Sequence, residues 1–550
     1  MNILPYLKRD FVPDLKAGFI TAIVALPLAI AFAIASGVDS YMGIYTAIIA
    51  GVLGSLFGGS KFSITGPTGA MTVIILSTVH SFGLEGLLLA GFLAGVMQII
   101  FGTVRLGMIV KFIPLPIISG FTAGIGVIIF VGQIANFLGI KVPAQEHIWN
   151  TLLEIFKHLS QVNLIAVGIS IFTILLLIFL PKLFSRVSFL ERIPASFFAL
   201  VACVSFVYFF TPSSLPVVGV IPTELPSFHF FNINFELFKS VLPAAFTIAL
   251  LGSIEALLCA VVADGMTNTK HNSNKELVSQ GIANTVLPFF GVIPATAAIA
   301  RTAVNIREGA KTKWAGVYHA LFLFLIVVLF ASLGTYLPMS FLAGVLMFVS
   351  FKMINFKEFK TIANISKADT LVLYLTFFLT IFTNLVFAVQ VGMFAAIFLI
   401  FMRLTQMIEI APHVNLEEYD AEDKLEKAIP SVLKEKIAVY TINGPFFFGA
   451  MNVFDNKVSE QLPLEKEFII LRMKHVSFVD STGVERLKTF IHKRKKQGKE
   501  VFLTSVNKEV EKKLFADREF REMVKKEELF AKTSSALHHI EALDHLKTLG

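Results

Sequence analysis

Long apolar stretches alternate with short polar connections along most of the chain. Stretches of about 17 to 23 residues, the length that crosses roughly 30 Å of hydrocarbon as a helix, recur as far as about residue 408. Seven lie in the first half, at about 17–36, 41–57, 64–80, 84–101, 116–136, 163–181 and 194–210. Seven more follow a polar, proline-rich connection, at about 241–263, 277–292, 294–305, 315–333, 338–351, 370–386 and 387–408. The pattern predicts a polytopic α-helical membrane protein with 14 spans.

The basic residues favour one orientation of these spans. With the N-terminus in the cytoplasm, 18 of the 22 Lys and Arg before residue 400 fall in cytoplasmic loops, three fall outside and one, Arg301, lies within a span. Lys and Arg concentrate in cytoplasmic loops, so both termini are expected to be cytoplasmic. Seven spans in each half invert the halves relative to each other. We therefore predict a 7+7 inverted repeat, with repeat one at about 14–210 and repeat two at about 241–410.

The pattern changes beyond about residue 405. The segments 437–442 and 468–473 read as buried strands, 482–496 as a helix and 500–506 as a third strand. Strand, helix and strand in this order predict a small α/β domain. We assign 1–410 to the membrane domain, the charged stretch 411–436 to a connector and 437–550 to a soluble domain.

Composition agrees with this division and excludes several classes of function. The 550 residues are 55% hydrophobic and 16% charged, and the net charge of +8 arises entirely before residue 404. Basic residues placed in membrane loops do not indicate nucleic-acid binding. The two cysteines, Cys203 and Cys259, lie in apolar runs, which argues against a disulfide framework or a zinc site. GxGxxG, P-loop and GxSxG motifs are absent, so an enzyme or a transport ATPase is not expected.

Two segments break the helical rules inside the membrane, each at the third span of its half. They are SITGPTGAMTV at 63–73 and GVIPATAAIARTAVN at 291–305. A proline in each removes a backbone donor and favours an extended residue before it, so a short extended piece should lead into a helix that begins in mid-bilayer. Two such helix N-termini facing each other would attract an anion.

Most of the residues expected around that anion are small or carry hydroxyl groups: Thr68, Gly69, Ala70, Thr296, Ala297 and Ala298, with Ile299 next to them. Small side chains allow the anion to approach the backbone, and the threonine hydroxyls add donors. The alternative is that proline and glycine merely kink these helices, since both are common in membrane spans.

Three further residues carry candidate chemistry. Glu255 lies near the middle of the eighth span, where a carboxylate is costly, so it is interpreted as a proton carrier or cation ligand, with a structural hydrogen bond as the alternative. Arg301 either attracts the anion or marks the cytoplasmic end of a short helix. Cys259 lies one turn after Glu255, either as a coupling residue or as packing. Asp264 and His271 are interpreted as solvated loop residues.

Several stretches together resemble the SulP (sulfate permease) family of anion transporters, followed by a STAS domain. They are ALPLAIAFAIASG (25–37), GIYTAIIAGVLGSLFGGSK (43–61), TGPTGAMTV (65–73), LGSIEALLCAVVADGMT (251–267), PATAAIARTAVN (294–305) and VDSTGVERL (479–487). The resemblance implies a core domain and a gate domain moving in an elevator-like cycle, an inner-membrane location and a homodimer. It also implies that the anion lies between the third and tenth spans.

The stretches ALPLAIAFAIASG and PTGAMTV are most similar to the bicarbonate-transporting branch. That branch carries Asp and Thr where this chain has Glu255 and Cys259, and a Thr where it has Ala298 and Ile299. A thiol is a poor Na⁺ ligand, so the resemblance favours H⁺ over Na⁺ as the coupling ion. In the tail, Ser481 matches the phosphorylated serine of STAS proteins, with a helix N-cap as the alternative reading of the DSTG motif. The resemblance also implies a cytosolic regulator as a partner of the STAS domain.

The sequence thus predicts secondary active transport of a small anion of the bicarbonate or sulfate class. Transport of a C4-dicarboxylate on the same fold is the nearest competitor. An uncoupled anion channel or exchanger, a membrane-tethered signalling protein and a nucleobase permease are further hypotheses for this chain. No cofactor is expected apart from H⁺ or Na⁺ as the coupling ion.

Overall fold

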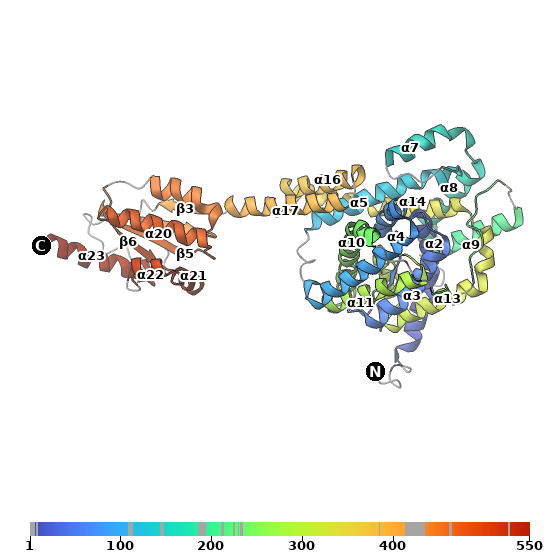
Figure 1. Ribbon diagram of the computed structural model, residues 1–550, viewed down its shortest axis with the longest axis horizontal. Coiled ribbons are helices and arrows are strands. Elements are labelled where there is room, and N and C mark those ends of the chain that lie inside the picture. Colours follow the sequence, from blue (N-terminus) through green and yellow to red (C-terminus); the bar gives the residue numbers. More distant parts are fainter. Residues whose placement is uncertain are drawn as a thin grey trace. The chain divides into compact units, whose positions relative to one another are not determined.

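The computed structural model describes most of the chain. The described residues are 6, 9–107, 114–142, 148–184, 194–210, 214–223, 226–228, 230, 235–383, 385–406, 408–412, 435–460, 465–525 and 528–549. They form two compact units, Met1–Ala396 and Ile397–Gly550 (Figure 1).

The first unit is almost entirely helical. Its first half contains α2 (Phe11–Ala35), α3 (Ser40–Phe57), β1 (Thr65–Gly66), α4 (Gly69–Thr103), α5 (Leu115–Gly132), α6 (Ile134–Leu138), α7 (Ile148–Lys157), α8 (Leu164–Phe184) and α9 (Ala195–Phe210). Its second half contains α10 (Phe235–Thr267), α11 (Ser273–Val286), β2 (Thr296–Ala297), α12 (Ile299–Arg307), α13 (Trp314–Phe330), α14 (Met339–Met353), α15 (Phe356–Ile365), α16 (Lys367–Phe382) and the first part of α17 (Leu385–Gln406). Among the described residues, eight helical segments are long and apolar enough to cross a membrane.

Each predicted span coincides with a helix of the structure. The third and fourth spans follow each other without a loop and together form α4. The two helices meet in a kink at Gly83, whose φ of 69° lies in the left-handed region that favours glycine. The ninth span is α11 followed by a 3₁₀ turn, Leu287–Phe290. The short helices α7 and α15 were not predicted, because amphipathic segments of about ten residues lack the apolar length of a span.

The helices of the first unit pack in two groups. One contains α2, α3, α4, α10, α11, α12 and α13, and the other contains α5, α8, α9, α14 and α16. Small residues permit close packing in the first group. A Cβ added to Gly281 of α11 would lie 2.6 Å from the carbonyl oxygen of Gly95 in α4, so only glycine allows this approach. This grouping has the form of the core and gate domains that the family resemblance implies.

The second unit contains a five-stranded sheet in the order β3-β4-β5-β6-β7. The strands are β3 (Glu409–Pro412), β4 (Ile437–Asn443), β5 (Phe468–His475), β6 (Glu500–Thr504) and β7 (Leu529–Phe530). Strand β3 is antiparallel to β4, and the remaining neighbours are parallel. The three predicted strands are confirmed as β4, β5 and β6, whereas the edge strands β3 and β7 were not foreseen. Ala411 and Pro412, assigned to the connector, lie in β3, and the rest of that stretch as far as 434 lies outside the described residues.

Alternating side chains bury both faces of this sheet. Ile469 and Leu471 of β5 pack in one cluster with α20 (Ser481–Lys496), α21 (Lys508–Leu514) and α22 (Arg518–Met523). Phe468 and Ile470 point to the opposite face and pack with α23 (Thr533–Leu549). Side chains that point alternately to two buried faces are typical of a parallel sheet covered by helices on each side.

Candidate functional site

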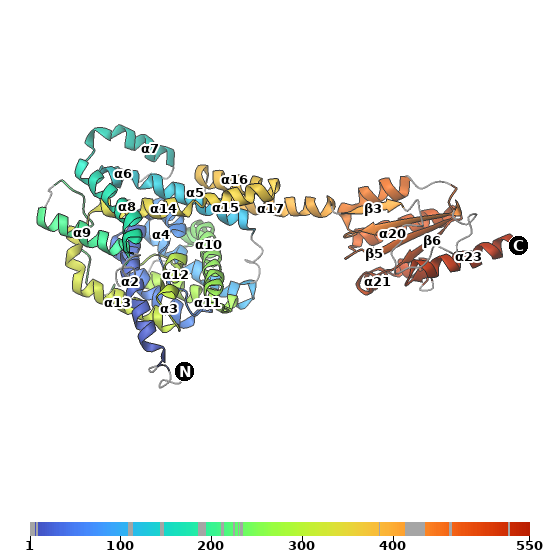
Figure 2. The same cartoon turned by 180° about the vertical axis from the view of Figure 1, so that it is seen from behind.

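The two proline-containing segments meet at the centre of the first unit. Strands β1 and β2 pair antiparallel, with Thr65 opposite Ala297 and Gly66 opposite Thr296. The Ala298 N–H extends the pairing by donating to the Ile64 carbonyl oxygen at 2.9 Å. Helices α4 and α12 begin directly after the strands, and α12 packs against α10 (Figure 2). The predicted order, an extended piece followed by a helix, is therefore present in both halves.

At the first segment, the candidate hydroxyl and the candidate carboxylate are bonded to each other. Thr68 occupies the N-cap position of α4 in an extended conformation, but its side chain does not cap the helix. Its Oγ1 instead donates to Oε2 of Glu255 in α10 at 2.8 Å. Thr68 is only 4% exposed, whereas Glu255 is half-buried. The structure thus joins two residues that lie 187 positions apart in the sequence.

Gly69 and Ala70 follow Thr68 in the first turn of α4. The first-turn N–H groups of a helix have no acceptor within the helix, so they are available to a ligand. Gly69 lies against Phe32, Ile129 and Met353, the nearest side chains that a Cβ there would meet. A cavity of about 510 Å³ is lined in part by Thr72, the residue one turn after Thr68, and by Ser77 and His80 further along α4.

The second segment uses its side chains differently. The Thr296 hydroxyl donates to the Gly252 carbonyl oxygen of α10 at 2.8 Å, and both Thr296 and Ala297 are fully buried. The N–H of Ala298 is occupied by the Ile64 carbonyl oxygen. The side chain of Ile299, the first residue of α12, is 39% exposed. Of the predicted residues here, Ile299 is therefore the most accessible.

Arg301 reaches from the second segment back to the first. It lies in the first turn of α12, which continues to Arg307, so the interpretation that it marks the end of this helix is wrong. Its Nη2 donates to the Pro67 carbonyl oxygen at 2.8 Å, and the side chain is 1% exposed. Nε and Nη1 have no hydrogen-bond partner among the described residues. A Cβ added to Gly66 would overlap Nη1, so glycine is needed beside the guanidinium.

Cys259 lies deeper in the interface between α10 and α12. It is fully buried in a small cluster with Ala256 and Ala297. Its thiol donates to Thr302 Oγ1 at 3.1 Å, and Thr302 in turn accepts the Ile64 N–H at 3.0 Å. These contacts place Cys259 in the framework behind the segments, in agreement with the packing alternative for this residue.

Comparison with known proteins identifies two matching families along the chain. The model of the Sulfate permease family matches residues 11–376, and that of the STAS domain matches residues 428–536. The chain belongs to the sulfate permease family. It is 37% identical to YvdB of Bacillus subtilis (strain 168) over 91% of this chain and 92% of that protein. It is also 33% identical to the bicarbonate transporter BicA of Picosynechococcus sp. (strain ATCC 27264 / PCC 7002 / PR-6), over 80% of this chain and 79% of that one.

The fold extends to more distant members. The structure of the murine Solute Carrier 26 family member A9 anion transporter, in the inward-facing state, superimposes with a TM-score of 0.87 at 19% identity and covers 98% of this chain and 93% of that one. The predicted fold class is confirmed: a helical membrane transporter region followed by a STAS domain. This member of the sulfate permease family is a multi-pass membrane anion transporter and not an enzyme.

A second set of polar side chains, which the sequence did not reveal, holds these segments in place. Asn284 of α11 accepts the Ala295 N–H at 2.8 Å and donates to the Ala295 carbonyl oxygen at 2.9 Å, just before β2. Asn305 donates to the Phe62 carbonyl oxygen, and Gln280 donates to Thr65 Oγ1. These amides resemble ordinary polar positions in a helical pattern, so nothing in the sequence alone marks them.

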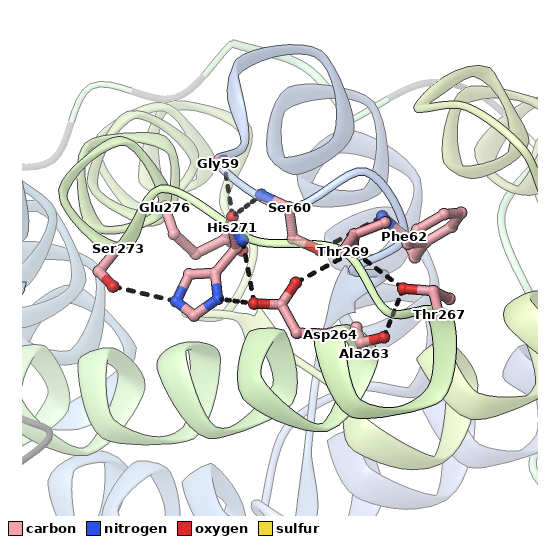
Figure 3. A network of polar contacts seen from close by, with 10 residues as sticks. All are labelled: Gly59, Ser60, Phe62, Ala263, Asp264, Thr267, Thr269, His271, Ser273 and Glu276. Atoms are coloured by element: carbon pink, nitrogen blue, oxygen red, sulfur yellow. Dashed lines mark hydrogen bonds and ion pairs between the residues drawn. The ribbon is translucent and has the colours of Figure 1, made fainter.

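Figure 3 shows a related network where α10 ends and α11 begins. His271 Nδ1 lies 2.7 Å from Asp264 Oδ2, and its Nε2 lies 3.0 Å from Ser273 Oγ. Glu276 is fully buried and accepts the N–H groups of Gly59 and Ser60 at 2.7 and 2.9 Å. The interpretation of Asp264 and His271 as solvated is wrong, because the turn that joins these helices folds back and brings the two side chains together.

In the STAS domain, the DSTG motif forms a helix start. Asp480 is the N-cap of α20, and its Oδ1 accepts the Gly483 N–H at 2.7 Å. The other carboxylate oxygen accepts the Phe448 N–H at 3.2 Å. Ser481 is the first helical residue and is exposed. The motif thus has the geometry of the N-cap alternative, and phosphorylation of Ser481 stays a prediction.

Proposed function

We propose that this transporter carries out secondary active transport of a small anion of the sulfate or bicarbonate class, coupled to protons through Glu255. The observation that carries this proposal is the hydrogen bond between Thr68 and Glu255. It joins the N-terminus of one half-helix, where an anion is expected, to the only carboxylate that the sequence places well inside a predicted span. Substrate binding and protonation would then affect the same pair of side chains.

The second half-helix supports anion binding. Arg301 is buried with two nitrogens that have no partner in the described part of the chain, and a buried cation without partners is costly. An anion between α4 and α12 would offset that cost and would also lie at two helix N-termini. We propose that the N–H groups of Gly69, Ala70 and Ile299 contact the anion. The site would then be shaped by the buried backbone and small side chains of Thr296, Ala297 and Ala298.

The carboxylate of Glu255 can hold a proton in the way this coupling requires. When it is ionised it accepts the Thr68 hydroxyl and lies in the field of Arg301. Protonation would remove the negative charge of Glu255, so the carboxylate would no longer repel the substrate anion as it enters. We propose H⁺ rather than Na⁺, because the thiol of Cys259 is a poor ligand for Na⁺ and is bonded to Thr302.

The family fold suggests how the site would be exposed to each side. We propose that the group of α2, α3, α4, α10, α11, α12 and α13 moves as a rigid core against the group of α5, α8, α9, α14 and α16. The bonds of Asn284, Gln280 and Glu276 to the segments around β1 and β2 would keep the site intact during this movement. We further propose an inner-membrane homodimer with both termini in the cytoplasm and a STAS domain that binds a cytosolic regulator.

The deciding experiment uses the purified protein in liposomes. Uptake of labelled bicarbonate, sulfate and succinate is measured with an imposed H⁺ gradient, an imposed Na⁺ gradient or neither. Concentrative uptake of bicarbonate or sulfate under the H⁺ gradient is expected. Concentrative uptake under the Na⁺ gradient alone would mean that Na⁺ and not H⁺ is the coupling ion. Uptake of succinate alone would mean that the substrate is a dicarboxylate. Flux that only runs downhill would make the protein a channel or exchanger and return Glu255 to a structural role.

A further inference from the structure

The short helix α15 connects two membrane-crossing elements at one end of the helical unit. Helix α14 ends at Met353, and the chain bends at Ile354 and Asn355, whose ψ values of 92° and 82° are not helical. Asn355 caps α15, and Ser366 caps α16 through the Asp369 N–H. Because α14 and α16 coincide with predicted spans, α15 lies where the chain leaves and re-enters the bilayer.

One face of α15 is fixed to the protein. Ser119 of α5 donates to Glu358 Oε1 at 2.8 Å. The Phe359 ring makes edge contacts with the rings of Tyr374 and Phe377 in α16, at centroid distances of 5.9 and 5.8 Å. Ile362 is buried on the same face. These contacts set the rotation of the helix, so the opposite face points away from the protein.

That opposite face and its flanks carry lysines beside aromatic rings. The lysines are Lys352, Lys357, Lys360 and Lys367, all exposed. We call these four residues, together with Phe351 and Phe356, the basic helix face. The two phenylalanines are 59% and 61% exposed, and their ring centroids lie 6.0 Å apart. None of the four lysines forms an ion pair with a carboxylate of the described residues.

The other short amphipathic helix of this unit provides a contrast. Helix α7 also exposes large apolar side chains, with Trp149 52% and Phe156 68% exposed. Its lysine, however, is already paired, because Lys157 Nζ lies 2.6 Å from Glu154 Oε1. Both helices therefore expose large apolar side chains. Lysines without an ion-pair partner among the described residues occur on α15 and its flanks.

We propose that the basic helix face binds the headgroups of anionic phospholipids, with Phe351 and Phe356 in the acyl boundary beneath them. An amphipathic helix with basic and aromatic side chains lies in the membrane interface and is attracted by negatively charged lipid. A lipid fits better than an acidic protein segment for two reasons. The rings would be out of water only in a bilayer, and the helix is joined at both ends to helices that enter it.

The test measures lipid retention by the purified full-length protein. Wild type and the variant K352Q/K357Q/K360Q/K367Q are incubated in detergent with phosphatidylglycerol or phosphatidylcholine, and bound lipid is counted by native mass spectrometry. Each lysine near anionic headgroups contributes about a fivefold preference, so removing four charges is expected to reduce retained phosphatidylglycerol by at least about tenfold. Retention of phosphatidylcholine is expected to stay unchanged.

Two further variants separate charge from folding and from general surface effects. The corresponding four Lys→Arg substitutions keep the charge and are expected to retain phosphatidylglycerol as wild type does. Lys157→Gln removes a paired lysine of α7 and is expected to have no effect on lipid retention. Wild-type retention of phosphatidylglycerol by the four-glutamine variant would overturn the proposal, and so would equal loss of both lipids.

Discussion

The two half-helix segments share one backbone plan and differ in their side chains. In the first, the Thr68 hydroxyl is bonded to Glu255, and the helix begins at a glycine. In the second, the Thr296 hydroxyl is bonded to a backbone carbonyl, and the helix begins at Ile299. The Arg301 side chain of this helix donates to the Pro67 carbonyl oxygen of the first segment. The inverted repeat therefore supplies a symmetric scaffold. The first half adds the hydroxyl of Thr68 to it, and the second half adds both the carboxylate of Glu255 and the cation of Arg301.

Helix α10 serves both segments from one face. Gly252 accepts the Thr296 hydroxyl and Glu255 accepts the Thr68 hydroxyl, and residues three apart lie on the same side of a helix. The bond at Gly252 involves only a backbone carbonyl on the α10 side, so it does not depend on a side chain of α10. The bond at Glu255 needs a carboxylate. The difference between the two threonine bonds thus depends on a single side chain of α10, which makes it testable by substitution.

The largest effect is expected from Glu255→Gln. The amide keeps the size of the side chain and an oxygen that accepts the Thr68 hydroxyl, but it cannot carry a proton or a charge. Accumulation against a gradient should fall to background in proteoliposomes, while binding of the anion persists. Glu358→Gln is the matched control, because Glu358 also accepts a hydroxyl, from Ser119, outside the site. Normal concentrative uptake by the Glu255 variant would remove the coupling role.

The next effect tests the cation of the second repeat. Arg301→Gln removes the buried charge and the bond to Pro67, and charged hydrogen bonds in buried sites are among the strongest. The half-saturation constant for the anion should rise on the order of tenfold to a hundredfold, corresponding to about 1.5–3 kcal/mol. Arg307→Gln, at the exposed end of the same helix, should leave the constant unchanged. An equal change in both variants would mean that only the overall charge of α12 matters.

A smaller effect is expected at Gly66, where the first repeat packs against Arg301 of the second. Gly66→Ala places a methyl group closer to Arg301 Nη1 than van der Waals contact allows, so the guanidinium or β1 must move. Overpacking of this kind costs typically about 1–3 kcal/mol, so the thermal midpoint should fall and the uptake rate should drop. Gly168→Ala serves as the control, since no atom lies within 4 Å of the added carbon in α8. A fully active Gly66 variant would show that the guanidinium moves freely at this position.

The smallest effect compares the two threonines directly. Thr68→Val removes a hydroxyl at the proposed site, and the loss of one hydrogen bond of about 1 kcal/mol should raise the half-saturation constant roughly fivefold. Thr296→Val removes a hydroxyl that α10 already occupies, so it should lower stability and leave the constant unchanged. Labelled-anion binding and thermal melting distinguish the two. The same change in affinity for both variants would mean that the segments are functionally equivalent.

Much of the fold followed from local pattern. Apolar length located every span, and the prolines of the two segments predicted where helices begin inside the bilayer, because both signals depend on neighbouring residues alone. Short apolar runs likewise located β4, β5 and β6. The strands β3 and β7 escaped detection because they are short edge strands, formed only when the rest of the sheet is present to pair with them.

The candidate site was only partly predictable. Its residues were found because a carboxylate and an arginine are unusual at membrane depth, and because prolines mark the two interrupted segments that contain the threonines. Their partners were not, since the bond between Thr68 and Glu255 and the bond between Arg301 and Pro67 span 187 and 234 positions. The error about Asp264 and His271 has a local origin, because the sequence does not show how tightly the turn between these two residues folds back on itself.

The sequence by itself determined that this protein crosses a membrane, that its halves repeat in opposite orientation and that a soluble α/β domain follows. These properties arise from hydrophobic length, charge distribution and residue periodicity, which act locally. Only the tertiary structure decided that the two interrupted segments pair with each other, that one threonine contacts a carboxylate while its counterpart contacts backbone, and that a buried arginine connects the repeats. Those features depend on which groups satisfy one another's hydrogen bonds in a closely packed, water-poor interior, and that choice is made only when distant parts of the chain come together.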